Sequence, residues 1–314
     1  MVSSLATLGD RNFIIAFLLP IVIAALAFLG VFHDLPHVDN WWQVVKQAEK
    51  FASLTLLVLA LWCAAVLLSI FNITLFKILE GYTGPLAWDC FKERGPALRE
   101  RARNKLIAMK ADVDREGTES PAYQAYLLAR QYFQDSYPAL PELTLPTRFG
   151  NVVRSCETYS FTVYGVDCIP AWLRLAGVIP AAFQSAIDNA RAEVDFFVSM
   201  TFLALAFALV CAGSLLTMPY LVFDPGVVRR LVALPISLFV MFASYEAAIY
   251  RARAWGEFVR SAFDLYLPAL AAQLGYALPA SKDERRSFWG DLNAMFLDKV
   301  PIEPRNWPPA GKSG

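Results

Sequence analysis

The sequence predicts an all-α membrane protein with four transmembrane helices in two pairs and a cytosolic helical domain between the pairs. Hydrophobic residues make up 57% of the 314 residues, and charged residues only 18%. Average soluble domains contain about 25% charged residues, so this chain needs lipid or a large core to bury its apolar side chains. The apolar residues gather in four windows that reach the roughly 20 residues needed to cross a bilayer as a helix. The windows are residues 13–32, 51–76, 196–223 and 231–250.

None of the four windows carries the polar stripe of a soluble amphipathic helix. The first three contain no charged residue, and the fourth contains only Glu246. Pro219 lies near the end of the third window. The first window is longer than the roughly 7–15 apolar residues of a signal-peptide core, and Arg11 is the only basic residue before it. We therefore expect it to be a membrane anchor rather than a cleaved signal.

The placement of Lys and Arg predicts the orientation in the membrane. Residues 77–195 and the tail after residue 250 are rich in both, whereas the loop between the first two windows has only Lys46 and Lys50. Cytoplasmic loops carry the excess of basic residues. We therefore expect a protein of the bacterial inner membrane whose two termini and middle domain lie on the cytosolic side. Arg229 and Arg230, in the short loop before the fourth window, oppose this assignment. The expected domains are 1–80 (first transmembrane pair), 81–194 (cytosolic helical domain), 195–250 (second transmembrane pair) and 251–314 (cytosolic helix and tail).

The middle domain is expected to contain an amphipathic helix and one further helix after the helix of the second span ends near Glu80. Apolar residues recur every three or four positions from Leu98 to Val113, and Gly117 follows that helix. Ser120 and Pro121 are typical of the start of the further helix in this domain, because Ser caps a helix and Pro fits its first turn. The prolines at 138, 141 and 146 then exclude regular helix.

The third window is expected to belong to a longer helix that begins just after Pro180. It continues without Gly or Pro as far as Ala212, which corresponds to about 48 Å at 1.5 Å per residue. The fourth helix is likewise expected to continue past Tyr250. No Gly/Ser-rich linker separates these segments. The sequence therefore predicts a cytosolic bundle built on extensions of the spans.

No metal or cofactor site is expected. The five cysteines contain no C-x-x-C pair and are expected to be free, mostly buried thiols. Pro36 lies between His33 and His37 and disfavours a helix that would bring the two side chains together as metal ligands. No histidine or other base accompanies a nucleophile such as Ser155, so an enzyme is not expected.

Two sets of polar residues are candidates for binding or conduction. The basic face of the first amphipathic helix suits an anionic lipid or a phosphate-bearing ligand, although a solvated face would look the same. Four polar residues near the cytosolic ends of the spans would form a polar ring at a pore mouth if they converged in an oligomer. Glu246 would equally pair with Arg251 or Arg253. The basic set is Arg99, Arg101, Arg103, Lys105 and Lys110. The span set is Asn72, Glu80, Asp195 and Glu246.

The densest polar segment begins with PTRFGN at Pro146. Thr147 is the expected N-cap of a helix, and Gly150 in its first turn allows another helix or a ligand to approach. Arg154 and Glu157 are spaced for an ion pair. This segment is either a buried polar network that fixes the packing or a binding surface that couples a ligand to the spans. The coupling residues would be Thr147, Arg148, Asn151, Arg154, Glu157, Tyr164, Asp167 and Arg174.

The same segment resembles a family of uncharacterised bacterial four-span membrane proteins. The shared pattern is P-T-R-x-G-N-x-x-R-x-x-E, then Y-G-x-D, then W-x-R-L. It covers about 30 residues and implies no activity. The matching positions are Pro146, Thr147, Arg148, Gly150, Asn151, Arg154, Glu157, Tyr164, Gly165, Asp167, Trp172 and Arg174. The layout is also loosely similar to membrane effectors of antiphage (antiviral) defence systems.

These observations lead to two functional hypotheses. The first is an oligomeric, channel-like or membrane-perturbing effector that is gated by a ligand or protein partner at its cytosolic domain. The second is a non-conducting scaffold or accessory subunit of a membrane complex. Both require the lipid bilayer as a partner, and the first requires a homo-oligomer, because one chain with four apolar spans cannot line a pore alone.

Overall fold

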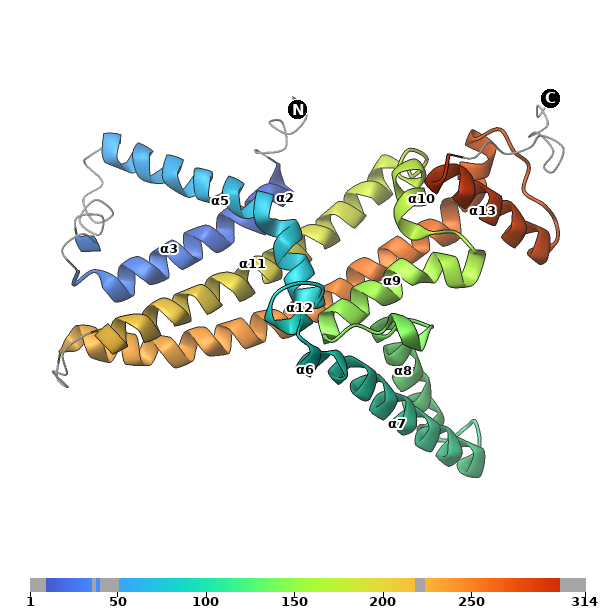
Figure 1. The fold of residues 1–314 in the computed structure, drawn as a ribbon, viewed down its shortest axis with the longest axis horizontal. Helices are drawn as coiled ribbons and strands as arrows, with labels where there is room; N and C mark the ends of the chain where they lie inside the picture. Colours follow the sequence, from blue (N-terminus) through green and yellow to red (C-terminus); the bar gives the residue numbers. More distant parts are fainter. Residues whose placement is uncertain (1–9, 36–37, 40–50, 218–223, 300–314) are drawn as a thin grey trace. The chain divides into compact units, whose positions relative to one another are not determined.

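The computed structural model describes residues 10–35, 38–39, 51–217 and 224–299, which form helices and no β-strand (Figure 1). Four helical stretches of this part of the chain are long and apolar enough to cross a membrane: Arg11–Phe32, Thr55–Ala87, Ala181–Leu216 and Pro225–Gln273. The all-helical class and the four candidate spans are thus as the sequence predicts. Pro219, His37, Lys46 and Lys50 lie outside the described residues. The elements are α2 (Arg11–Phe13), η2 (Ile14–Leu18), α3 (Leu19–Phe32), α5 (Phe51–Glu80), η3 (Pro85–Ala87), α6 (Asp89–Lys92), α7 (Arg94–Glu116), α8 (Pro121–Ser136), η4 (Pro141–Leu143), α9 (Arg148–Tyr164), α10 (Cys168–Leu175), α11 (Ala181–Thr217), α12 (Pro225–Gln273) and α13 (Lys282–Leu297).

The first span is one helical stretch in which a π-helical turn precedes a proline. Pro20 lies in the first turn of α3, and the π-helical segment η2 ends two residues before it. A proline inside a helix lacks an N–H donor, and its ring conflicts with the carbonyl group four residues earlier, here that of Ala16. The wider π-helical turn accommodates that conflict, so the helix continues through the proline.

The chain divides into two compact units. The span unit consists of Met1–Lys77 and Asn189–Arg251, and the cavity unit consists of Ile78–Asp188 and Ala252–Gly314. The helices α5, α11 and α12 each contribute residues to both units. The expected extensions of the third and fourth helices are present, because α11 begins at Ala181 and α12 continues to Gln273.

Most apolar side chains of the span unit point outward. Only 11% of the apolar window is buried within the chain in each of the first two spans, and 33% and 22% in the third and fourth. A water-soluble protein would bury such helices. These surfaces therefore need lipid or other protein chains around them.

An ion-pair cluster joins the end of α3 to the start of α12 within the span unit. Asp34 pairs with Arg229 at 3.2 Å and with Arg230, which is fully buried and lies over the Phe32 ring. Burial by itself raises the pKa of Asp34, but backbone hydrogen bonding and the two arginines outweigh it and hold the pKa below its ordinary value. The two arginines that oppose the predicted orientation are therefore charge-paired by Asp34.

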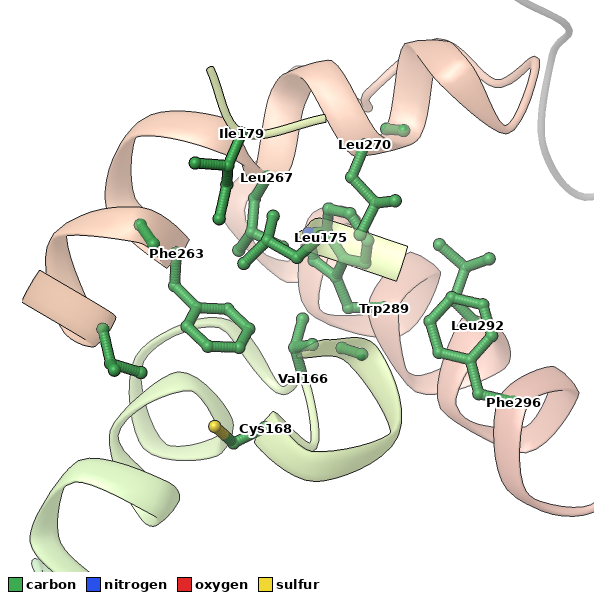
Figure 2. Close-up of a cluster of buried hydrophobic side chains, with 14 of the residues drawn as sticks. Val166, Cys168, Leu175, Ile179, Phe263, Leu267, Leu270, Trp289, Leu292 and Phe296 are labelled. Atoms are coloured by element: carbon green, nitrogen blue, oxygen red, sulfur yellow. The ribbon is translucent and has the colours of Figure 1, made fainter. Parts of the chain in front are cut away.

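The cavity unit has its own hydrophobic core, formed by α9, α10, α12, α13 and the first turns of α11. Figure 2 shows Leu175 of α10, Leu267 of α12 and Trp289 of α13 pointing toward one another. Val166, in the turn between α9 and α10, and Phe263 of α12 are also fully buried. The core ties the tail helix α13 to the segment that begins with PTRFGN.

Candidate functional site

Thr147 caps helix α9 and connects it to the end of α5. Its hydroxyl oxygen accepts the Gly150 N–H at 2.9 Å, and the same hydroxyl donates to the Leu79 carbonyl oxygen at 2.6 Å. The N-cap prediction is confirmed. Because the last carbonyls of a helix have no partner within it, this bond also satisfies the end of α5.

Gly150 is required by the same junction. A Cβ atom at this position would fall inside the contact distance of the Glu80 carbonyl oxygen. A Cβ on Gly95 would likewise collide with the backbone of Leu145. The close approach that the sequence predicted at Gly150 is thus made by the end of α5 rather than by a ligand.

Asn151 is fully buried and holds the chain that enters α9. Its amide nitrogen donates to the Leu145 and Thr147 carbonyl oxygens, both at 2.8 Å, and its Oδ1 accepts the Leu145 N–H at 2.7 Å. The side chain has no surface left for a ligand. The contacts of Asn151 and Thr147 favour a packing role, the first of the two interpretations that the sequence left open, and the coupling role of the segment stays a prediction.

Four other residues of the predicted coupling set lie in three different surroundings. Arg154 and Glu157 form the expected pair at 3.3 Å, with both side chains less than a third exposed. Arg148 lies beside the Tyr132 hydroxyl. Arg174 is exposed, donates to the Pro170 carbonyl oxygen at 2.7 Å and lies over the Phe296 ring at 4.0 Å.

The Y-G-x-D turn is held by a residue of the tail helix. Asn293 of α13 donates to the Gly165 carbonyl oxygen at 2.7 Å and accepts the Asp167 N–H at 3.0 Å. Gly165 has a φ of +81°, the left-handed conformation that glycine adopts freely. Asp167 thus takes part through its backbone. The sequence offered no local sign of Asn293, because 126 positions separate it from Asp167.

A half-open cavity of about 660 Å³ lies in the cavity unit, lined by α7, α8, α9 and α12. Ligand pockets are typically about 300–1,000 Å³, so this volume suits a small organic molecule. Its charged lining residues are Arg99, Arg130, Arg260, Asp135, Glu257 and Asp264.

The wall of the cavity formed by α12 is a network of ion pairs. Arg260 is only 8% exposed and donates to Asp135 at 2.8 Å and to Glu257 at 2.9 Å. Burial raises the pKa of Asp135 above its ordinary value, and the Arg260 charge offsets part of that rise. The two carboxylates therefore balance the charge of the Arg260 guanidinium group and fix its position.

Two tyrosines of α9 meet Asp264 of α12. Tyr164 donates its hydroxyl proton to Asp264 at 2.7 Å, and Tyr159 donates at 2.9 Å. Burial, together with the bond to Asp264, raises the pKa of Tyr159 to about 12 and that of Tyr164 further. Both hydroxyls therefore stay protonated at neutral pH. Of these three residues, only Tyr164 belonged to the predicted set.

The basic residues of α7 differ in how far they are exposed. Arg101, Arg103, Lys105 and Lys110 are exposed, and Arg103 lies 3.6 Å from Glu100. Arg99 differs because it is buried, lines the cavity and lies over the Phe133 ring. Its position within the fold, and not its basicity, sets it apart from its neighbours.

The predicted polar set of the spans is only partly brought together. Asn72 donates to Asp195 at 3.0 Å, and Arg191 donates to the same carboxylate at 3.2 Å. Glu246 is half buried in the same unit, whereas Glu80 belongs to the cavity unit. Asn72 and Asp195 form a polar contact between α5 and α11.

The described residues contain no cluster of three or more metal-ligating side chains. Cys156 and Cys168 are buried free thiols, as expected, and burial raises the pKa of Cys156 to about 12. Such a thiol is protonated at neutral pH and is a poor nucleophile.

Comparisons with protein-family models, with curated proteins and with solved structures gave no match.

Proposed function

We propose that this is a multi-pass protein of a bacterial inner membrane in which a small ligand, bound in the cavity, changes the state of the transmembrane helices. The observation that supports this proposal most is the continuity of α12. This one helix of 49 residues includes a candidate span and also supplies Glu257, Arg260 and Asp264 to the cavity wall. A ligand that favours one position of the α12 wall would act on the same helix that crosses the bilayer.

The proposed output is a change in membrane permeability by a homo-oligomer. The low burial of the first two spans supports this, because their apolar faces are available to neighbouring chains and lipid. The Asn72–Asp195 contact supplies polar groups among otherwise apolar helices, and such groups commonly mark ion pathways. In this arrangement both termini and the cavity unit face the cytosol, where a bacterial effector would meet its ligand.

The test is ion flux through proteoliposomes that contain the full-length protein. Arg260→Gln removes the centre of the network with Asp135 and Glu257, and we expect it to change the flux from the wild-type level. Arg101→Gln makes the same change of charge at an exposed position of α7 and should leave the flux unaltered. Flux equal to that of protein-free liposomes, for the wild type and both variants, with and without the low-molecular-weight fraction of a cell extract, would contradict the proposal.

A second candidate function is a non-conducting accessory subunit of a membrane complex. It is favoured by the outer face of α10, where Ile169 is 70% exposed and Leu173 is 81% exposed. Exposed apolar residues at successive turns suit contact with another protein. Ile169→Lys together with Leu173→Lys would then release a co-purifying subunit while the protein stays folded. Unchanged association in this double variant would count against a subunit interface there.

A further inference from the structure

Arg99 is the one charged residue of the cavity that is buried without a carboxylate partner within the described residues. It is 9% exposed, and its Nη2 donates to the Ala139 carbonyl oxygen at a long 3.3 Å. Its Nε is buried and has no hydrogen-bond partner in the part of the chain that the structure describes. The contrast with Arg260, which has two carboxylates, lies within the same cavity.

A guanidinium group in this state is costly to the folded protein. Removing a cation from water is unfavourable unless an anion and hydrogen-bond acceptors replace the water. The Ala139 carbonyl group and the Phe133 ring, 5.5 Å from the guanidinium carbon, supply only part of that replacement. Burial, and to a smaller degree the nearby Arg103, hold the pKa of Arg99 below its ordinary value, although the charges of Glu100 and Glu142 offset part of this effect.

We propose that the cavity binds a small organic anion and that Arg99 holds its carboxylate or phosphate group. The planar guanidinium group donates two parallel hydrogen bonds to a carboxylate or a phosphate group. Its two Nη nitrogens would be the donors, because the Nε atom is buried away from any molecule in the cavity. This inference rests on the proposed function, since it names the class of ligand for the same cavity.

The remaining walls restrict that class further. The Phe133 and Tyr137 rings pack against each other with centroids 5.3 Å apart and line the cavity, so they offer an apolar surface to a ring on the ligand. On the α12 wall, Glu257 is already paired with Arg260, whereas Asp264 accepts hydrogen bonds only from tyrosine hydroxyls within the described residues and would repel a second negative charge. The geometry therefore favours an anion with an aromatic or other flat apolar part and with a neutral or positive opposite end.

Binding can be measured on the full-length protein in detergent by saturation-transfer NMR and by thermal unfolding. Phenyl phosphate tests a phosphate group, benzoate tests a carboxylate, and benzyl alcohol has the ring without the charge. We expect at least one of the two anions to bind and to raise the unfolding temperature, and benzyl alcohol to do neither. Which anion binds more tightly decides between the phosphate and the carboxylate.

Variants of α7 separate a binding role from a structural one. Arg99→Gln should weaken binding of the anion by about tenfold or more, because it removes a charged double hydrogen bond. The exposed Arg101→Gln should change it less than about twofold, since exposed charges are screened by solvent. Without a probe, Arg99→Gln should unfold at the wild-type temperature or above it, because an uncompensated buried charge has been removed.

The inference would be overturned if neither anion bound the wild type. It would also fail if Arg101→Gln weakened binding as much as Arg99→Gln does. A third contrary result would be an Arg99→Gln protein that unfolds at a lower temperature without a probe but still binds the anion. If neither anion binds but Arg260→Gln still alters ion flux, the anionic ligand is wrong and ligand gating of the spans stands. If the anion binds as expected and no flux occurs under any condition, the site stands and the permeability function fails.

Discussion

Replacing Asn151 by alanine tests whether the PTRFGN segment is a packing junction. The substitution removes three hydrogen bonds, two to Leu145 and one to the Thr147 carbonyl oxygen. The Thr147 carbonyl oxygen keeps a partner, because the backbone N–H of residue 151 still donates to it at 3.1 Å. The loss therefore falls on the N–H and C=O groups of Leu145.

A buried backbone group without a partner costs about 1–3 kcal/mol. Two such groups would cost about 2–6 kcal/mol, but Leu145 is only half buried, so water reaches them in part. We therefore expect Asn151→Ala to lower the free energy of unfolding by about 2–4 kcal/mol. Asn151→Asp has nearly the same shape yet should be worse than alanine, because it places a carboxylate oxygen 2.8 Å from two carbonyl oxygens.

Urea unfolding of the full-length protein in detergent, followed by tryptophan fluorescence, measures these differences. Hydrogen exchange of α9 and of the last turn of α5 locates them. Thr162→Ala is the control: Thr162 is exposed on α9, and we expect a change of about 0.5 kcal/mol or less. An Asn151→Ala protein that is as stable as this control, or an aspartate variant more stable than the alanine variant, would refute the packing role.

Three further predictions concern other parts of the fold. Gly165→Ala should cost about 1–2 kcal/mol of unfolding free energy in the same assay, because the position has a φ of +81° and a Cβ would press on Arg286; an unchanged midpoint would contradict this. The pKa of Asp34 is lower in the folded protein than its ordinary value of 3.8. Its contribution to stability is therefore complete above that value and is lost as the pH falls through the folded pKa. Asp34→Asn should make the free energy of unfolding depend less on pH in this acid range. At pH 8, Cys156 should resist iodoacetamide in the folded protein and react after unfolding, because its pKa is about 12; rapid labelling of the folded protein would show that the thiol is accessible.

Features encoded along one stretch of the chain were predictable from the sequence. The four apolar windows, the start of α11 after Pro180 and the Thr147 cap depend on neighbouring residues and on spacing within one helix. Steric and hydrogen-bonding rules act over a few positions there, so the residues themselves carry the information. The role of Gly150 was half visible, since the sequence indicates a close approach but not that α5 makes it.

The cavity was not predictable in this way, because four helices assemble it. Arg260 and Glu257 are three positions apart on α12 and look like an ordinary surface pair, whereas their third partner, Asp135, is 125 positions from Arg260. The difference between Arg99 and the other basic residues of α7 was not predictable for the same reason. These residues look alike in the sequence, and only the packing of α8 against α7 gives Arg99 surroundings that differ from those of Arg101.

The residues of the PTRFGN segment and the residues of the cavity differ in whether contacts within the chain satisfy them. Thr147, Gly150 and Asn151 make their contacts with backbone atoms of the junction between α5 and α9. A different ligand would therefore not require different residues at these three positions. Arg99 has the opposite character, because its contacts within the chain leave it incompletely satisfied. A chain that shares the pattern should therefore share the junction between α5 and α9, while its ligand is set by the residues at the positions of Arg99, Arg260 and Asp264. Exchanging those three residues should change which anion binds without changing the fold, whereas no exchange within PTRFGN should alter the ligand without first destabilising the junction.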